Sequence, residues 1–411
     1  MITVVFLHSH DHFIPGKIAK HQFSSSNLIA TEIYETLNND PNVSIHYFDS
    51  RKIKEWRKIK ADFLITLVDN LKLSIWYFKP GKVILIGVNK HPLLRLKSLA
   101  IAKQKKLPQS ALSGHDGIYE PILPLRRIDY LVCIGNNYTF DSYKRYFDKL
   151  RIVKTHYNSK NFEPPNIINS QIQNRLQRNS ILVSMSSIGF RKNYDFINEL
   201  LKNPNTPLNR YDIYVIGSPA TPYWASIIDS NKKAPNFNFM GYIEKLSAKS
   251  RDINLVLTKI KVALVPTLED ASPGSMLDLI NSGILCLHNQ ENSGVQNTVD
   301  ALHSDFLSVE SVIRQIDFLM QLDEESFSNL QRTQQLDLKK MFNETYTFTK
   351  AIKYALYDNS FTENYTRVKY LRIFIDYIHV PLLRYPYVFL RRFYRNVLVS
   401  FYNRLYLILR R

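Results

Sequence analysis

Short apolar runs typical of buried β-strands alternate with helix-period segments along most of this chain, and the alternation occurs twice. The first series of apolar runs comprises residues 2–7, 43–48, 62–68, 82–88 and 130–135, the last being the expected final strand of its half. The second series comprises residues 181–187, 211–217, 236–243, 261–266 and 284–289. Strand–helix–strand order is typical of parallel sheets covered by helices. The sequence therefore predicts two α/β domains, each with its own sheet.

The boundaries of these domains follow from local composition. We expect a first domain over residues 1–155 and a linker over 156–179, which is rich in Asn, Pro and Ser. A second domain is expected over residues 180–358, followed by a tail over 359–411. Two such domains facing each other would form a cleft at the carboxyl ends of their strands, the usual place for a ligand.

Composition narrows the classes of protein that the chain can belong to. Hydrophobic residues make up 45% and charged residues 22% of the 411 residues, which is typical of a globular protein. The two cysteines, Cys133 and Cys286, form no metal or disulfide pattern, so we expect buried thiols in a reducing compartment. The opening residues MITVVFLHSH are typical of a first strand rather than a signal peptide, and we expect no transmembrane helix.

Several catalytic motifs are missing from the sequence. It contains no G-x-G-x-x-G fingerprint, no Walker loop, no G-x-S-x-G elbow and no clustered Cys/His metal pattern. These absences argue against a simple dinucleotide dehydrogenase, a P-loop ATPase and an α/β-hydrolase.

The most informative stretch is KVALVPTLEDASPGSMLDLINSGILCLHN, residues 261–289. Asp270 and Asp278 flank small residues that mark the start of a helix, where free N–H groups and the helix dipole favour phosphate. A carboxylate there can accept hydrogen bonds from sugar hydroxyls. Arg191 and Lys192 follow the 181–187 strand and supply the cations that a diphosphate needs.

These residues resemble the retaining GT-B glycosyltransferases of the group 1 type. The pattern of that family is a strand, a proline, two acids separated by seven residues, and a small-residue helix closed by glycine. The matching residues, in order, are Pro266, Asp270, Asp278 and Gly283. The resemblance extends from residue 155 to residue 358, whereas the first half of the chain matches only in layout.

The resemblance implies two Rossmann-like domains facing a cleft and a specific activity. The expected reaction transfers a hexosyl unit from a nucleotide-diphosphate sugar to a hydroxyl of a glycan or lipid-linked acceptor. It implies retention of anomeric configuration, no metal, no other cofactor, and a place in surface polysaccharide or glycolipid synthesis. The alternative function is that of a catalytically silent GT-B scaffold or sugar-binding partner protein. It is favoured by two aspartates where the family has glutamates, and by Ser187 where the family has an arginine.

By the same resemblance, site residues fall into three groups. The catalytic group contains Asp270 for the sugar hydroxyls, Lys192 for the leaving diphosphate, and His115. The donor-binding group contains Asp278, Arg191, Ser272, Gly274, Ser275 and Gly217. The acceptor-side candidates are His8, His10 and Gly16.

Taken one at a time, these residues have ordinary structural explanations. The acids would be solvated residues at a helix start, Lys192 an exposed surface lysine, and the histidines polar loop residues. Gly217 would be a turn glycine and Gly283 a helix C-cap.

Charge is concentrated in the tail. The net charge is +18, and residues 365–411 supply ten Lys/Arg against one acid. Arginines alternate with aromatic residues at helical spacing, which favours an amphipathic helical tail on an anionic membrane surface. Packing against the core is an alternative, and nucleic acid is the least favoured partner. We therefore expect a cytoplasmic protein, peripheral at the inner face of the membrane.

Overall fold

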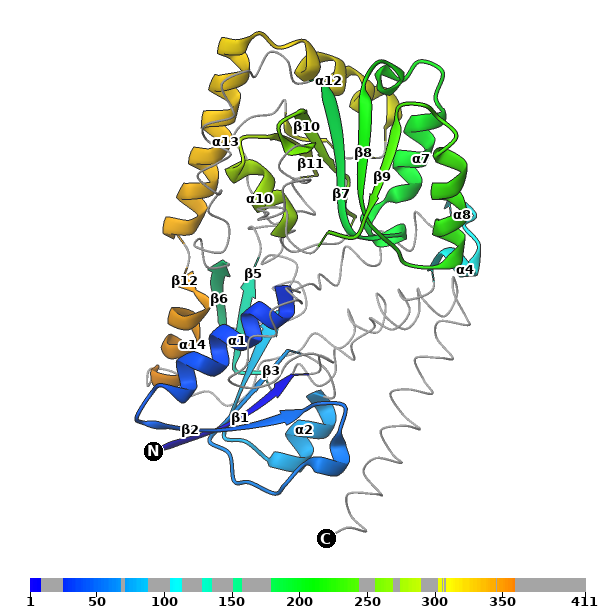
Figure 1. The fold of residues 1–411 in the computed structure, drawn as a ribbon. Coiled ribbons are helices and arrows are strands. Elements are labelled where there is room, and N and C mark those ends of the chain that lie inside the picture. The colour runs from blue at the N-terminus through cyan, green and yellow to red at the C-terminus, as the bar shows by residue number, and fades with distance from the viewer. Residues whose placement is uncertain are drawn as a thin grey trace. The chain divides into compact units, whose positions relative to one another are not determined.

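A computed structural model shows that the chain divides into two compact units (Figure 1). Unit 1 comprises Met1–Val88, Asp116–Tyr157 and Thr345–Arg411, and unit 2 comprises Asn89–His115 and Asn158–Glu344. The structure describes residues 1–8, 25–67, 71–87, 104–112, 128–134, 151–156, 179–243, 256–268, 274–289, 302–304, 306, 308–344 and 346–358.

The described part of unit 1 is a parallel sheet with helices packed on it. Its strands are β1 (Ile2–His8), β2 (Val43–Asp49), β3 (Phe63–Thr66), β4 (Lys82–Gly87), β5 (Tyr130–Ile134), β6 (Arg151–His156) and β12 (Tyr346–Thr347). Its helices are α1 (Ser25–Asn38), the 3-10 helix η1 (Ile53–Glu55), α2 (Leu71–Phe78) and α14 (Phe348–Tyr357). The strand order is β12-β6-β5-β4-β3-β1-β2, and each neighbouring pair is parallel.

One strand of this sheet was not expected. The prediction that residues 130–135 form the last strand of the first half is wrong, because β6 pairs with β5 along Arg151–His156. Charged Arg151 and exposed Lys154 interrupt the apolar run, so that only part of this strand is buried. An edge-proximal strand of this kind lacks the continuous apolar signal of β3 or β4.

The C-terminal helix of the described chain also packs on unit 1, although residues up to 358 were predicted to belong to the second domain. Thr349 Oγ1 donates a 3.0 Å hydrogen bond to Glu32 on α1, and Tyr357 OH donates a 2.9 Å bond to Asp40. Asp358 forms an ion pair with Arg151. Local patterning predicts the helix, but it carries no information on which sheet the helix covers.

The described part of unit 2 is a second parallel sheet between helical layers. Its strands are β7 (Ser180–Ile188), β8 (Asp212–Pro219), β9 (Phe237–Gly241), β10 (Ile260–Val265) and β11 (Leu285–His288). Its helices are α4 (Gln109–Leu112), α7 (Tyr194–Lys202), α8 (Pro222–Asn231), α10 (Gly274–Asn281), α12 (Val309–Gln321), α13 (Glu324–Glu344) and the 3-10 helices η6 (Phe190–Lys192) and η7 (Pro207–Arg210). The strand order is β11-β10-β7-β8-β9, again with parallel neighbours.

The direction of the side chains along the strands of unit 2 shows which helices cover which face of the sheet. Val183 and Val262 belong to the apolar cluster that also contains buried residues of α7, α8 and α12. Cys286 Sγ instead lies 3.9 Å from the Met276 carbonyl oxygen of α10. Successive strand side chains point to opposite faces of a sheet, so α10 covers the other face, with α13 packed beside it (Figure 1).

Both cysteines are buried free thiols, as the sequence predicts. Burial raises the pKa of Cys133 to about 12, so this thiol stays protonated at neutral pH. Among the described residues, no helix has both the length and the apolar content needed to cross a bilayer.

A bulge near the end of β7 explains why residue 217 is a glycine. The β7–β8 register shifts between Ser184 and Ser187. Beside this irregularity, Gly217 has φ +144°, and a Cβ there would lie 2.3 Å from the Met185 carbonyl oxygen. Gly241 also has a positive φ of +73°, but a Cβ there would meet nothing within 4 Å.

These two glycines make a matched pair for a stability test. Gly217→Ala combines backbone strain with a backbone clash, and we expect it to lower the free energy of unfolding by about 3 kcal/mol or more. Gly241→Ala meets only the left-handed strain of about 1 to 2 kcal/mol. Urea unfolding followed by fluorescence measures both, and equal losses would contradict the close approach at Gly217.

Candidate functional site

The strand order of unit 2 reverses between β7 and β10, and such a reversal marks the usual ligand position at the carboxyl ends of a parallel sheet. β7 ends at Ile188 and β10 ends at Val265. The segments that follow these two strands are joined, because Leu268 N donates a 3.0 Å hydrogen bond to the Arg191 carbonyl oxygen. The backbone at this edge is thus fixed from both strands.

The segment after β7, residues 189–193, is here called the cationic loop. Lys192 N and Tyr194 N both donate hydrogen bonds to the Gly189 carbonyl oxygen, at 3.2 and 3.3 Å. Asn193 adopts a left-handed conformation with φ 58°, which asparagine tolerates better than most residues. Its Nδ2 donates a 3.0 Å bond to the Phe306 carbonyl oxygen. Contacts both within the loop and from distant sequence therefore set its shape.

The two predicted cations sit in this loop. Lys192 is buried, with only 5% of its surface exposed, and Arg191 is half-buried. The alternative that Lys192 is an exposed surface lysine is therefore wrong. Burying an ammonium group costs free energy unless anions or dipoles compensate it. The cationic loop therefore brings a buried lysine and a half-buried arginine to the carboxyl edge of the sheet.

Helix α10 begins after β10 and carries the second predicted acid. Gly274 and Ser275 form its start, and Asp278 lies about one turn further on with 6% of its surface exposed. Asp278 is therefore a buried acid and not a solvated one. The helix ends as predicted at Gly283: Gly283 N bonds the Ile280 carbonyl oxygen at 3.0 Å, and φ at Gly283 is +76°.

The structure places some of the predicted site residues and does not describe others. Six predicted site residues lie near the carboxyl ends of β7, β8 and β10 or on the segments that follow these strands: Arg191, Lys192, Gly217, Gly274, Ser275 and Asp278. Those outside the described residues are His10, Gly16, His115, Asp270 and Ser272. Their roles stay predictions. The contacts of Gly217 give it a structural task in the sheet, in line with the turn-glycine alternative.

Sequence reasoning missed a polar group at the end of β11. His288 is fully buried, and its ring centroid lies 5.7 Å from that of His303. Burial, with a smaller contribution from His303, lowers the pKa of His288 to about 3, so its ring is neutral at physiological pH. Asn289, the next residue, is also buried. The sequence did carry a signal for this group, because the predicted strand 284–289 ends in two polar residues, His288 and Asn289.

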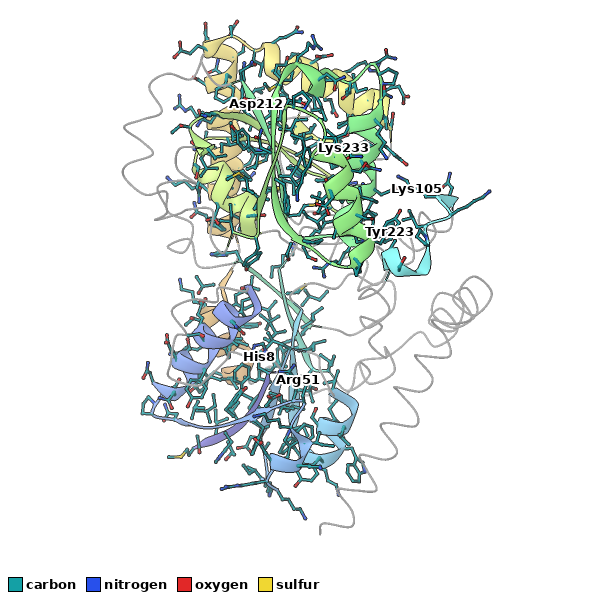
Figure 2. All side chains as sticks on the ribbon, turned by 45° about the vertical axis from the view of Figure 1, so that its right-hand side comes forward. His8, Arg51, Lys105, Asp212, Tyr223 and Lys233 are labelled. Carbon is teal, nitrogen blue, oxygen red and sulfur yellow. The ribbon has the colours of Figure 1, made fainter. Side chains whose placement is uncertain are left out.

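In unit 1 the strand order reverses between β1 and β3, and His8 is the last residue of β1 (Figure 2). Its side chain is 4% exposed, and Nε2 donates a 3.1 Å hydrogen bond to Asn27 Oδ1 on α1. Its carbonyl oxygen accepts bonds from Ser50 N and Tyr47 OH, at 3.2 and 3.3 Å. The polar-loop alternative for His8 is therefore wrong, because the residue is a buried strand terminus.

Within the described residues, no group of three or more His, Cys, Asp or Glu side chains is arranged to hold a metal ion. No sequence-family model and no curated protein sequence matches this chain.

Solved structures are nevertheless similar in fold over most of the chain. Sucrose-phosphate synthase from Thermosynechococcus elongatus has 11% identity and a TM-score of 0.57, covering 87% of this chain and 98% of its own. WaaG, a glycosyltransferase involved in lipopolysaccharide biosynthesis, has 12% identity and a TM-score of 0.53, covering 87% of this chain and 100% of its own. HepE from Anabaena, solved in complex with UDP and glucose, has 9% identity and a TM-score of 0.52, with coverages of 88% and 100%.

Sequence identities this low establish shape and not activity. The proteins named above cover this chain across both of its units, and the parallel sheets agree with the architecture expected from the sequence. This chain has the fold of the GT-B glycosyltransferases.

Proposed function

We propose that this chain is a glycosyltransferase that moves a hexosyl unit from a nucleotide-diphosphate sugar to a hydroxyl of a glycan or lipid-linked acceptor. The observation that carries the proposal is the edge of the second sheet, where a buried lysine and a helix start follow the two strands of a topological switch. Cations and free helix N–H groups are the groups that bind a diphosphate.

The proposed reaction requires these residues to stabilise the leaving diphosphate. The bond between the anomeric carbon and the diphosphate oxygen breaks, and its electron pair stays with the diphosphate. A new bond forms to the acceptor oxygen, whose proton is released. In this proposal Lys192 and Arg191 counter the growing negative charge, which is effective because they are already held in place. Asp278 binds the donor ribose and Asp270 the transferred sugar. Retention of configuration and independence of metal are part of the proposal.

The acceptor side of the proposal rests on unit 1. His8 ends β1 at the switch point of the first sheet, and Asn27 fixes its ring. An imidazole ring can form a hydrogen bond with a hydroxyl. We assign the acceptor contacts to this edge, together with His10, Gly16 and His115.

Donor binding can be tested before any acceptor is known. We expect UDP-glucose, GDP-mannose or ADP-glucose to raise the melting temperature, since a ligand at a hundredfold excess over Kd stabilises by about 2.7 kcal/mol. Asp278→Asn keeps the side-chain shape and should abolish the shift. Asp212→Asn is the control, because Asp212 is an exposed residue at the amino end of β8 (Figure 2).

The outcomes of this test distinguish an active glycosyltransferase from a catalytically silent scaffold. No shift with any nucleotide sugar, or an unchanged shift in Asp278→Asn, would contradict the donor site. Binding without release of nucleoside diphosphate across a panel of glycan and lipid-linked acceptors would favour the catalytically silent scaffold. Ser187, half-buried near the end of β7 in place of the family's arginine, is the observation that keeps this second candidate open.

We further propose that the protein works in the cytoplasm at the inner membrane surface, in polysaccharide or glycolipid synthesis. The tail, residues 365–411, lies outside the described residues. Within them, residues 51–60, here called the basic segment, supply supporting charge. Its six Lys/Arg are all exposed and stand against one acid; they are Arg51, Lys52, Lys54, Arg57, Lys58 and Lys60.

The basic segment is anchored by an aromatic residue. Trp56 is 3% exposed, and its Nε1 donates a 2.9 Å hydrogen bond to the Asp49 carbonyl oxygen. Tyr77 of α2 donates through its hydroxyl to the Trp56 carbonyl oxygen at 3.4 Å. Trp76 and Tyr77 are themselves half-buried. Cations beside amphipathic aromatic rings suit the headgroup layer of an anionic membrane.

Vesicle binding tests this membrane proposal. Replacing Arg57, Lys58 and Lys60 by glutamine should weaken binding to phosphatidylglycerol-containing vesicles about tenfold or more, since each cation contributes about 1 kcal/mol near such a surface. The control variant loses the same number of positive charges, because glutamine replaces the exposed Lys202, Lys233 and Lys259 of unit 2. Equal loss in both variants, or binding that persists after deletion of 365–411 together with the basic-segment changes, would contradict the proposal.

A further inference from the structure

Residues 104–112, here called the strap, lie between β4 and β5 in sequence but belong to unit 2. Ala111 is buried with 2% exposure inside the apolar cluster of unit 2, and Leu107 packs against that cluster. Helix α4 of the strap packs on α8. The connection between two strands of one sheet is thus built into the packing of the other unit.

An ion-pair cluster ties the strap to the first turns of α7. Lys105 Nζ lies 2.8 Å from Asp195 Oδ2 and 2.9 Å from Glu199 Oε2. The Asp195 side chain is only 10% exposed and that of Lys105 is 21% exposed. Water screens such a pair less than an exposed one. Figure 2 shows Lys105 on the short cyan segment, in the same region as Tyr223 at the start of α8.

A buried tryptophan joins the strap to the other end of the cationic loop. Trp224 is fully buried, and its Nε1 donates a 3.0 Å hydrogen bond to the Ala111 carbonyl oxygen. A Cβ placed on Gly189 would lie 3.6 Å from Trp224 Nε1 and 3.1 Å from the Cβ of Ala220. Trp224 also packs edge-on against Tyr194, with ring centroids 6.2 Å apart.

These contacts bracket the cationic loop. Gly189 opens the loop and rests near Trp224, which the strap holds at Ala111. Asp195 follows the loop at the start of α7, and the strap holds it through Lys105. The strap therefore contacts the structural supports on both sides of Arg191 and Lys192.

We propose that the strap positions the cationic loop for the donor diphosphate, with Lys105 and Trp224 as positioning residues. The consequence for catalysis rests on the proposed function, whereas the mechanical coupling does not. A cation stabilises a leaving diphosphate only when it needs no reorganisation. Loosening the strap should therefore weaken donor binding without removing any group that touches the donor.

Hydrogen–deuterium exchange on the full chain tests the coupling without any ligand. The amides of Lys192, Asn193 and Tyr194 form hydrogen bonds within the loop, so their exchange reports its opening. We expect Lys105→Met and Trp224→Phe to speed this exchange about fivefold or more. Amides of β8 should be unchanged. Lys105→Arg should restore slow exchange, because it keeps the charge.

The matched control is Arg210→Met, which breaks the exposed ion pair with Asp317 elsewhere in unit 2. Trp224→Phe keeps an aromatic ring but removes the hydrogen bond to Ala111 and part of the buried ring volume. It perturbs the same support independently of Lys105, so it remains informative should Lys105→Met fail to fold. Loop exchange equal to that of wild type in Lys105→Met and Trp224→Phe, or speeded equally in Arg210→Met, would overturn the proposal.

Kinetics then test the consequence for the donor. With whichever of UDP-glucose, GDP-mannose or ADP-glucose serves as donor, Lys105→Met should raise its KM about fivefold while changing kcat less, and Lys105→Arg should reverse the change. Faster loop exchange with an unchanged donor KM would also overturn the proposal. A wild-type chain that binds none of these donors would instead refute the proposed function, and the exchange measurement would still decide the coupling.

Discussion

The hydrogen bond from Leu268 N to the Arg191 carbonyl oxygen joins the segments that leave β7 and β10, and the candidate site depends on it. Parallel strands deliver their carboxyl ends to one edge, but they do not fix the loops beyond it. Here a backbone bond, the left-handed turn at Asn193 and the bulge accommodated by Gly217 fix them together. These constraints hold the backbone of Lys192 at the carboxyl edge of the sheet.

The chain passes between its two units more often than a simple pair of domains requires. Helix α14 returns to the first sheet, held by Glu32 and Asp40, and the strap leaves unit 1 to pack on α7 and α8. Each unit is thus completed by a segment from elsewhere in the sequence. The strap, which comes from the first half of the chain, thereby contacts Trp224 and Asp195 on either side of the cationic loop.

Local patterning predicted both sheets and most strands, because continuous apolar runs such as those of β4 and β10 mark buried parallel strands. It missed β6, whose charged residues interrupt the run, and it assigned α14 to the wrong sheet. The segment SMLDLINSG, residues 275–283, was predicted to be a short helix, and α10 covers Gly274–Asn281. The strap contacts of Lys105 and Trp224 could not be predicted, because they join residues about a hundred positions apart.

A crystal structure of the chain with UDP, GDP or ADP bound tests most directly whether the edge of the second sheet is a diphosphate site. We expect a terminal phosphate oxygen within hydrogen-bond distance of Lys192 Nζ and of the first amides of α10, and the ribose hydroxyls at Asp278. A nucleotide bound away from both the cationic loop and α10 would contradict the assignment of this edge as the donor site.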